Sequence, residues 1–446
     1  MDNAKFVTGS TLKHVLVMTA TGSIGLVAVF IVDALSLFYI SLLKQQELTA
    51  AVGYASTLLF FNLSVGIGLA VASTALTSRA IGNGDKDKAN RTAGSSLLIV
   101  LVVSVLLTVL LYPFLEYLTA LIGAKGETAR LALRFMRIVL PSVPLLALGM
   151  CLGGLLRSTG DAKRAMWVTL GPAAVITVVD PLLIFGLGLE LDGAAYAVVI
   201  ARIAMVTIGL YGLLRIHKLY ERPSIKSALT DLKPFMAIGI PAILTQIATP
   251  FANAFVTSSM ASYGDDAVAG WAIVSRIIPV AFGVIFALSG SVGPIIGQNL
   301  GAGRIDRVRS TVKDSLKISL VYCLLIWLLL ALLSGQIATA FGAHTQAREV
   351  IVFFCIFIAG TFVFNAAMFV ANAAFNNLGF AFYSTAINWG RATVGVIPFI
   401  TLGGYWYGAK GVMAGYGLGA VVFGLVSAWL CAKVLSKLEV SQAIPR

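Results

Sequence analysis

Two aspartates lie in the middle of long apolar segments, where an ionisable side chain is unusual. Asp33 falls in the segment 15–43 and Asp180 in the segment 165–189, and no other acidic residue lies in mid-segment. A charged carboxylate in hydrocarbon is costly unless it faces water or a partner, so such residues mark ion and substrate paths. The chemistry open to them is uptake of a proton on one side of a membrane and release on the other, or binding of a cation.

The composition indicates a membrane setting. Hydrophobic residues make up 59% of the 446 residues, charged residues 11%, and the mean hydropathy is +0.93. A spanning helix needs roughly 20 apolar residues. We therefore predict an all-α integral membrane fold with about twelve transmembrane helices. They are expected over 15–43, 48–78, 95–121, 131–156, 165–189, 193–214, 234–262, 266–299, 315–333, 350–375, 381–403 and 411–432.

The net charge of +13 does not indicate nucleic acid, because the basic residues gather in short loops between the predicted spans. With a cytoplasmic N-terminus, the inner segments hold 22 of the 32 Lys and Arg residues and the outer loops hold 7, while Arg202, Arg276 and Arg391 fall within spans. Basic loops stay inside. Both termini are predicted to be cytoplasmic, in a multi-pass protein of a prokaryotic inner membrane.

Residues for enzyme or cofactor chemistry are not recognisable. The chain has no nucleotide-binding glycine loop, and no soluble stretch is long enough for an ATPase domain. Its four cysteines lie in apolar segments without metal-like spacing, and its three histidines are scattered at span ends. We expect no enzyme activity, no cofactor and no metal, so transport would draw on a gradient of H⁺, or alternatively of Na⁺.

The chain also contains two copies of one unit, about 215 to 220 residues apart. The run VGYA at Val52–Ala55 recurs as AGWA at Ala269–Ala272, and each is followed by a Gly-rich exit and a basic loop. Six spans in each copy make the copies parallel, related by an axis along the membrane normal. We predict an amino-terminal lobe over 1–218 and a carboxy-terminal lobe over 219–446, around a central cleft that forms the substrate path.

In this order on a duplicated chain, several short motifs resemble a multidrug and toxic compound extrusion (MATE) transporter over nearly the whole length. Besides the paired Gly-rich loops they are IVDA at Ile31–Ala34, LRSTGD at Leu156–Asp161 and DPLLIFG at Asp180–Gly186. The resemblance implies export of organic cations and amphipathic compounds by alternating access, driven by inward proton or sodium flow. The acid of the first span and the Asp-Pro of the fifth are similar to the DinF-like and archaeal branch, in which the amino-terminal lobe is thought to carry the coupling proton.

Helix geometry places both aspartates at one depth. Asp33 lies 11 residues before Lys44 and Asp180 lies 10 before Glu190, so each carboxylate is roughly 15 Å below the outer surface. Alignment of the two copies makes Asn253, which cannot titrate, the counterpart of Asp33. The second lobe has no mid-span acid. The sodium site that sodium-coupled relatives place there should be absent, which favours proton coupling through the first lobe.

Asp33 is the predicted main protonation site, because no basic residue lies near it in its span. In the expected mechanism, neutral Asp33 favours one packing of the span, while the ionised form binds a cationic compound or favours the other. Gly22 and Gly25 in the same span would allow bending. Archaeal relatives bend this span at a proline, which is absent here. The alternative is that Asp33 only forms a hydrogen bond to a neighbouring helix.

Asp180 has an alternative of its own. Arg202 falls at the same depth in an antiparallel helix pair, so a permanent ion pair would make both residues structural. Pro181, which frees a backbone carbonyl in mid-helix, favours a working site. Where relatives often carry Asn, four residues before this aspartate, the chain has Ile176, and Thr177 is the nearest polar substitute.

Softer candidates complete the predicted site. Asn62 is expected to bond Asp33, with interhelical packing as the alternative. An apolar, adaptable substrate pocket is predicted, lined by Tyr39, Phe60, Phe61 and Met150. The alternative is that these side chains only pack against other groups in the membrane.

Three other functions remain open in principle. A lipid or glycolipid flippase of the same superfamily would share the two lobes but should carry several cationic residues facing its cleft. A channel would conduct passively, and acids in one lobe only are an odd basis for a symmetric pore. An intramembrane enzyme needs a nucleophile or metal set. The expected partners are cationic or amphipathic small molecules and the lipid bilayer, and a monomer suffices.

Overall fold

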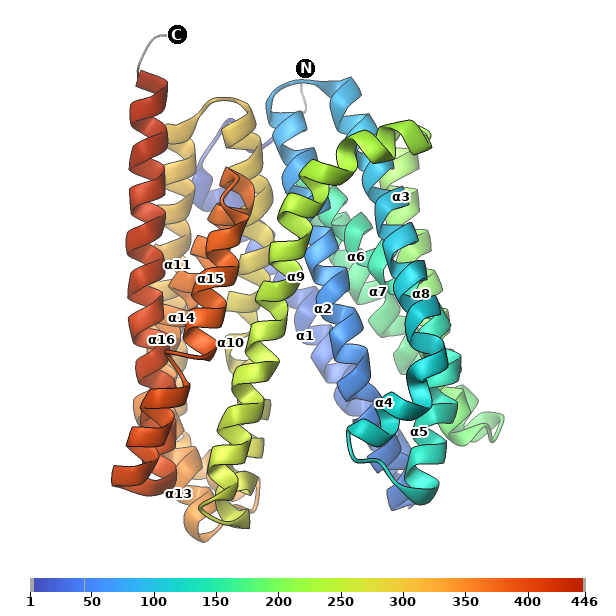
Figure 1. Ribbon diagram of the computed structural model, residues 1–446, viewed down its shortest axis with the longest axis vertical. Helices are drawn as coiled ribbons and strands as arrows, with labels where there is room; N and C mark the ends of the chain where they lie inside the picture. The colour runs from blue at the N-terminus through green and yellow to red at the C-terminus, as the bar shows by residue number, and fades with distance from the viewer. Residues whose placement is uncertain (1–3, 44, 444–446) are drawn as a thin grey trace. The chain divides into compact units, whose positions relative to one another are not determined.

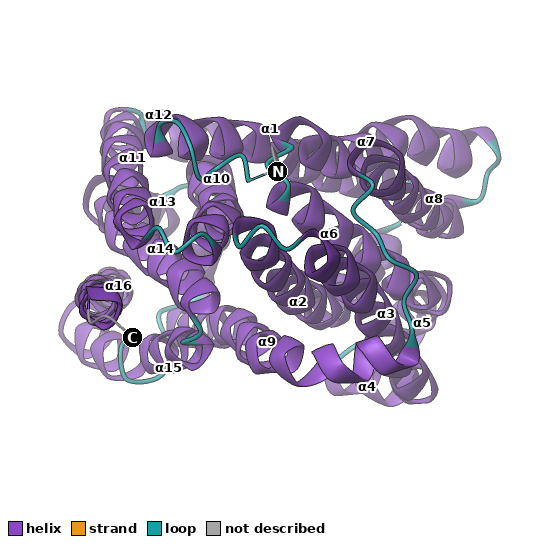
Figure 2. Ribbon diagram, turned by 90° about the horizontal axis from the view of Figure 1, so that it is seen from above, coloured by secondary structure: helices purple, strands orange, loops and turns teal. Residues whose placement is uncertain are grey.

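The computed structural model describes residues 4–43 and 45–443, so Lys44, which served to judge the depth of Asp33, lies outside the described residues. Every regular element in this part of the chain is a helix (Figure 2). The chain forms two compact units. Unit 1 consists of Met1–Lys5 and Ile24–Ile243, and unit 2 of Phe6–Ser23 and Leu244–Arg446. The all-α class predicted from the hydropathy pattern is confirmed.

Two helices contribute to both units. The first part of α1 (Thr11–Ser41) belongs to unit 2 and the rest to unit 1, while α9 (Ile225–Ala261) begins in unit 1 and ends in unit 2. The compact units therefore divide the chain within helices. The lobes 1–218 and 219–446 were drawn from the duplication, and they stay a prediction about the repeat.

The helices of unit 1 pack around α2, which contacts α3, α5 and α6, while α7 and α8 form a neighbouring pair (Figure 1). Between the shared helices they are α2 (Gln46–Gly82), α3 (Lys86–Leu111), α4 (Leu115–Leu121), α5 (Gly126–Val139), α6 (Val143–Ser158), α7 (Ala162–Pro181) and α8 (Glu190–Leu210).

Prolines divide some spans of unit 1 into two helices. Short 3₁₀ turns at Tyr112–Phe114 and Leu140–Ser142 contain Pro113 and Pro141. Proline lacks the N–H that continues an α-helix, so the ladder of hydrogen bonds is interrupted there. Directly after Pro181 the chain winds into a wider π-helical turn, Leu182–Gly186. These breaks leave backbone carbonyls available to side chains inside the membrane.

Small residues let the helices approach closely. A methyl group on Gly154 of α6 would lie 2.3 Å from the Thr74 hydroxyl of α2. The same holds on α1, where a methyl group on Gly25 would collide with Thr169 of α7. Small residues at helix interfaces are typical of membrane proteins. The helix α1 runs unbroken through Gly22 and Gly25, and the bending expected of these glycines stays a prediction.

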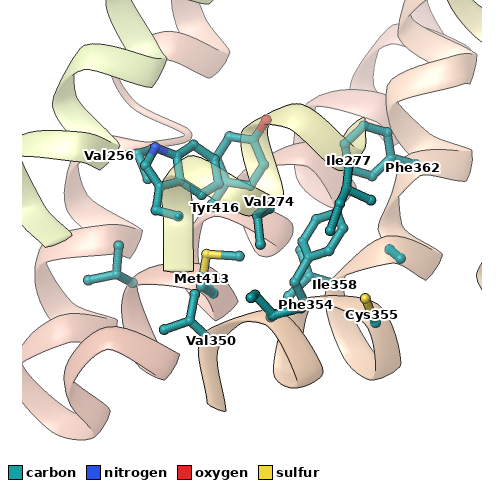
Figure 3. Packing of buried hydrophobic residues seen from close by; sticks show 14 of the residues in the cluster. Val256, Val274, Ile277, Val350, Phe354, Cys355, Ile358, Phe362, Met413 and Tyr416 are labelled. Atoms are coloured by element: carbon teal, nitrogen blue, oxygen red, sulfur yellow. The ribbon is translucent and has the colours of Figure 1, made fainter. Parts of the chain in front are cut away.

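The helices of unit 2 pack around α14, which contacts α10, α11 and α16 (Figure 1). They are α10 (Asp265–Gly301), α11 (Ile305–Leu332), α12 (Ser334–Ala340), α13 (Thr345–Phe353), α14 (Phe362–Leu378), α15 (Ala381–Ala392) and α16 (Ile397–Ala443). Their apolar faces form a continuous core, in which Tyr416 and Met413 of α16 lie near Val274 of α10 (Figure 3).

A reversal within α16 completes the predicted number of spans. The described residues contain eleven helical stretches long and apolar enough to cross a membrane, of which the last, Ala381–Val440, is 60 residues long. Within it Gly408 has a φ of +61°, which turns the chain back on itself. Gly403 then lies against Gly411, Phe399 against Gly415 and Gly395 against Gly419. The long stretch is thus two antiparallel spans, as predicted over 381–403 and 411–432.

Candidate functional site

A buried carboxylate in unit 1 forms the centre of the candidate site. Asp180, at the end of α7, is 1% exposed. Its Oδ2 accepts a hydrogen bond from the hydroxyl of Ser36 on α1. Its Oδ1 is buried and has no hydrogen-bond partner among the residues that the structure describes. A buried carboxylate with one donor is short of hydrogen bonds, which suits a group that exchanges a proton or a cation.

The second carboxylate lies one helical turn from that hydroxyl. Asp33 precedes Ser36 by three residues on α1, so the two side chains lie on one face with Cβ atoms about 5–6 Å apart. Asp33 is exposed on the unit's surface. Within 4–43 and 45–443 it forms no hydrogen bond or ion pair. The structure therefore brings both predicted aspartates into one neighbourhood, and the alternative that Asp33 is occupied by a bond to another helix is not observed.

Ser36 is the part of this site that sequence reasoning missed. A serine hydroxyl has one donor and two acceptor positions. Here the donor is used on Asp180, and an acceptor remains for a protonated group approaching from the side of Asp33. Its spacing of three residues from Asp33 was the available signal, because residues three apart share a helix face.

Arg202 on α8 does not pair with Asp180. Its Nη1 donates to the Val139 carbonyl (3.0 Å) and to the Ser142 hydroxyl (2.7 Å). The Val139 carbonyl is available because the N–H of Val143 bonds Leu140 instead, in the 3₁₀ turn at Pro141. The Asp180–Arg202 ion pair considered from the sequence is absent, because a broken helix supplies neutral acceptors to the guanidinium.

The predicted polar neighbours of the aspartates bond their own helices. Asn62 on α2 is buried, and its Nδ2 donates to the Leu58 carbonyl at 3.3 Å. Its Oδ1 has no partner in the described part of the chain. Thr177 donates to the Ala173 carbonyl at 2.9 Å. Neither bonds an aspartate, so the expected Asn62–Asp33 bond is not observed.

The four predicted pocket residues divide into two groups. Tyr39 packs edge-on to Phe185, with ring centroids 6.3 Å apart, and Met150 packs against a small apolar cluster of α6, α7 and α8. These two side chains fill space within unit 1. Phe60 and Phe61 on α2 are exposed. Tyr39 and Met150 are partly exposed, and the pocket role of all four residues stays a prediction.

A polar cluster lies at the opposite end of α7, outside the membrane-spanning segments. Asp161 caps the helix by accepting from the Arg164 N–H at 3.0 Å. Its Oδ2 also accepts from Arg164 Nη1 at 2.5 Å and pairs with His217 Nε2 at 2.8 Å. Burial alone would raise the pKa of the Asp161 carboxyl, but the hydrogen bonds from Arg164 and His217 outweigh it and hold this pKa below its ordinary value.

Among the described residues, no group of three or more His, Cys, Asp or Glu side chains could hold a metal ion. The four cysteines are free and buried. The arrangement in unit 1 therefore offers carboxylate and hydroxyl chemistry.

Comparisons with known proteins agree with this architecture. The sequence model of the MatE family matches residues 23–182 and 241–402, and the second match begins 218 residues after the first, in keeping with the duplication. The FAD transporter of Shewanella oneidensis is 28% identical over 438 residues, covering 97% of this chain and 96% of the relative. The multidrug export protein MepA of Staphylococcus aureus is 26% identical over 311 residues, covering 68% of each.

A solved structure shares the fold. The MATE transporter VcmN of Vibrio cholerae superimposes with a TM-score of 0.90 at 24% identity, covering 96% of this chain and 97% of that one.

Proposed function

The chain belongs to the MatE family of membrane transporters, and from that premise we propose that it is a proton-coupled antiporter that exports organic cations and amphipathic compounds by alternating access. Family membership confirms the resemblance seen in the sequence, and it makes the chain a multi-pass membrane transporter rather than an enzyme. The coupling ion, the coupling residue and the substrates are the content of the proposal.

One observation carries the proposal: an exposed mid-span carboxylate, Asp33, lies one turn from a hydroxyl that bonds a buried carboxylate, Asp180. A hydroxyl that bonds one acid and shares a helix face with the other can pass a proton between an exposed position and a buried one. Unit 2 has no acid in the middle of any predicted span. Proton handling is therefore assigned to unit 1.

In the proposed cycle, ionised Asp33 attracts a cationic compound, and a proton arriving from outside neutralises it and releases that compound. Ser36 accepts a hydrogen bond from the protonated acid while donating to Asp180. The two protonation states differ in charge and in the hydrogen bonds that α1 makes to α7, so each favours a different packing of α1. That difference is what links proton entry to the exchange of the binding site between the two sides.

Sodium coupling is the second candidate. Two buried side-chain oxygens of unit 1, Asp180 Oδ1 and Asn62 Oδ1, have no donor among the described residues. Carboxylate and amide oxygens are the ligands that hard cations take. A sodium-coupled antiporter would use these oxygens, whereas the proton-coupled one uses Asp33.

The test is efflux of ethidium from proteoliposomes under an imposed proton or sodium gradient. The parent is compared with Asp33→Asn and Asp180→Asn, and with Asp87→Asn as a control at an exposed position in the first turn of α3. Efflux driven by protons, lost in Asp33→Asn and kept in Asp87→Asn, is the expected result. Sodium-driven efflux, or full activity in Asp33→Asn, would overturn the proposal and make lipid-linked substrate flipping the next activity to assay.

The same proposal places the protein in a prokaryotic inner membrane, as a monomer with both termini in the cytoplasm. The distribution of basic residues supports this orientation. Residues 1–3 and 444–446 themselves lie outside the described part of the chain. Protease accessibility of tags at each end, in inverted and right-side-out vesicles, tests the orientation.

A further inference from the structure

An arginine in unit 2 lies inside the membrane without a counter-ion. Arg276 on α10 is exposed on the unit's surface, and it forms no hydrogen bond or ion pair within the residues that the structure describes. The nine residues 267–275, none of them charged, separate it from Asp266 near the outer end of the helix. Arg276 lies about 16 Å along α10 from Asp265, the first residue of that helix. A guanidinium stays charged at any physiological pH, so at this depth it needs water or an anion.

The neighbouring helix places an amide at the same level. Trp271 of α10 donates to the Thr257 hydroxyl of α9 at 3.0 Å, which fixes the register of this antiparallel pair. Five residues further into the membrane along α10 is Arg276, and the corresponding position on α9 is Ala252, next to Asn253 in the chain. Asn253 is also exposed. It is the residue that the duplication aligns with Asp33, so the equivalent position in unit 2 carries an amide in place of a carboxylate.

The rest of unit 2 does not neutralise this charge. None of its acidic residues lies in the middle of a predicted span: Asp265 begins α10, and Asp314, in the first half of α11, accepts a hydrogen bond from the Thr11 hydroxyl. The other mid-span cation, Arg391, is buried, and its Nη1 donates to the side-chain Oδ1 of Asn365 at 3.4 Å. The membrane-embedded part of unit 2 is therefore positive, whereas that of unit 1 carries two acids against one arginine.

We propose that Arg276, with Asn253 at nearly the same level on α9, binds the anionic group of an amphipathic compound, a phosphate or a carboxylate. This rests on the proposed transport function and adds a substrate class to it: compounds that carry an acidic group on an apolar body. A guanidinium binds either group through paired N–H donors, and an amide adds another donor. Val280, one turn further along α10 and 69% exposed, offers apolar contact. A lipid headgroup phosphate has the same chemistry and is the competing source.

The test compares two fluorescent probes that share one ring system, riboflavin and riboflavin 5′-phosphate, for binding to the purified full-length protein in phosphatidylcholine nanodiscs. Because a charge-assisted hydrogen bond from Arg276 would be made only to the phosphate, the parent should bind riboflavin 5′-phosphate about tenfold to a hundredfold more tightly than riboflavin. Arg276→Gln should remove this preference. Arg276→Lys, which keeps the charge and loses the planar fork, should retain part of it. Arg348→Gln, at an exposed arginine of α13, is the matched control and should keep all of it.

Each outcome of this binding experiment either supports or refutes the anion site. Equal binding of the two probes by the parent, or a preference that survives Arg276→Gln, would refute the inference. A preference that disappears when phosphatidylglycerol is added to the nanodiscs supports the anion site and identifies a lipid headgroup as its occupant. Proton-driven ethidium efflux by the parent, measured in parallel, tests the proposed function independently, because that assay contains no anionic probe.

Discussion

The hydrogen bond from Ser36 to Asp180 is the contact on which the proposed proton path depends, and its removal has a calculable effect. Ser36→Ala leaves the buried Asp180 without any donor in the described part of the chain, because Oδ1 already has none. Losing a hydrogen bond to a charged group costs about 1.5–3 kcal/mol, against about 0.5–1.5 kcal/mol for a neutral one. The size of the loss therefore reports whether Asp180 is ionised in the resting protein.

A double-mutant cycle isolates this interaction. Asp180→Asn removes the charge and keeps an acceptor, so it should leave stability equal or higher. In that background Ser36→Ala should cost only the neutral value. For domains of about 150–250 residues 1 kcal/mol moves the melting temperature by roughly 2–4 °C, so Ser36→Ala alone should lower it by roughly 3–12 °C.

The protein carries its own reporter for the assay. Its four cysteines are free and buried, so a thiol-reactive dye becomes fluorescent only as the chain unfolds. Ser41→Ala is the matched control, because the Ser41 hydroxyl lies on the same helix and donates only to the Phe38 carbonyl of that helix, at 2.7 Å. If Ser36→Ala lowers the melting temperature no more than Ser41→Ala does, the Ser36–Asp180 bond is absent and the proton path argued from it is wrong.

Two further predictions concern the fold. Gly411→Ala would place a methyl group 1.8 Å from the Gly403 carbonyl oxygen, so it should lower the free energy of unfolding by at least about 1–3 kcal/mol, measured by thermal unfolding. Gly53→Ala is the control, because a methyl group there meets nothing within 4 Å, and it should be neutral or mildly stabilising. Equal effects of the two substitutions would contradict the packing. Asp161→Ala should cost about 0.5–2 kcal/mol through the lost helix cap. Because the pKa of Asp161 is lowered on folding, its contribution is complete above the ordinary value of about 4 and is lost as the pH falls through the lowered value. The gap between parent and variant, followed by tryptophan fluorescence, should shrink below about pH 4; a gap that widens there would show that the paired carboxylate is not its source.

Hydropathy and charge were sufficient to predict the fold, because the bilayer restricts a chain of this composition to helices of set length. What could not be predicted was where the ladder of helical hydrogen bonds is interrupted within a span. Pro113 and Pro141 each end one helix and begin another within a single span. Prolines can also be accommodated without a break, as Pro172 within α7 is. A proline in the sequence marks a possible break and does not decide it.

Counting residues predicted how deep the site residues lie along their helices, but not the direction in which their side chains point. Counting residues placed Asp33 and Asp180 at one level, and the structure brings them to one neighbourhood. Counting does not say which way each helix turns its side chains, so Ser36 was overlooked and an Asp180–Arg202 ion pair was left open as an alternative, which the structure does not show. Arg202 instead bonds the Val139 carbonyl, which is free only because of the turn at Pro141. A buried cation can thus be satisfied by neutral acceptors, here a backbone carbonyl and the Ser142 hydroxyl, and a search for acid–base pairs in the sequence overlooks that option.

The fold-back at Gly408 has a consequence for how the chain enters the bilayer. The aromatic side chains of Tyr405, Trp406 and Tyr407 are highly exposed at this turn, and such residues settle at the boundary between headgroups and hydrocarbon. Glycines bring the two backbones into direct contact on both sides of the turn. Because each segment packs directly on the other, we expect them to insert during biogenesis as one hairpin. The final topology of the newly made chain would then be set only once the segment after Gly408 has left the ribosome.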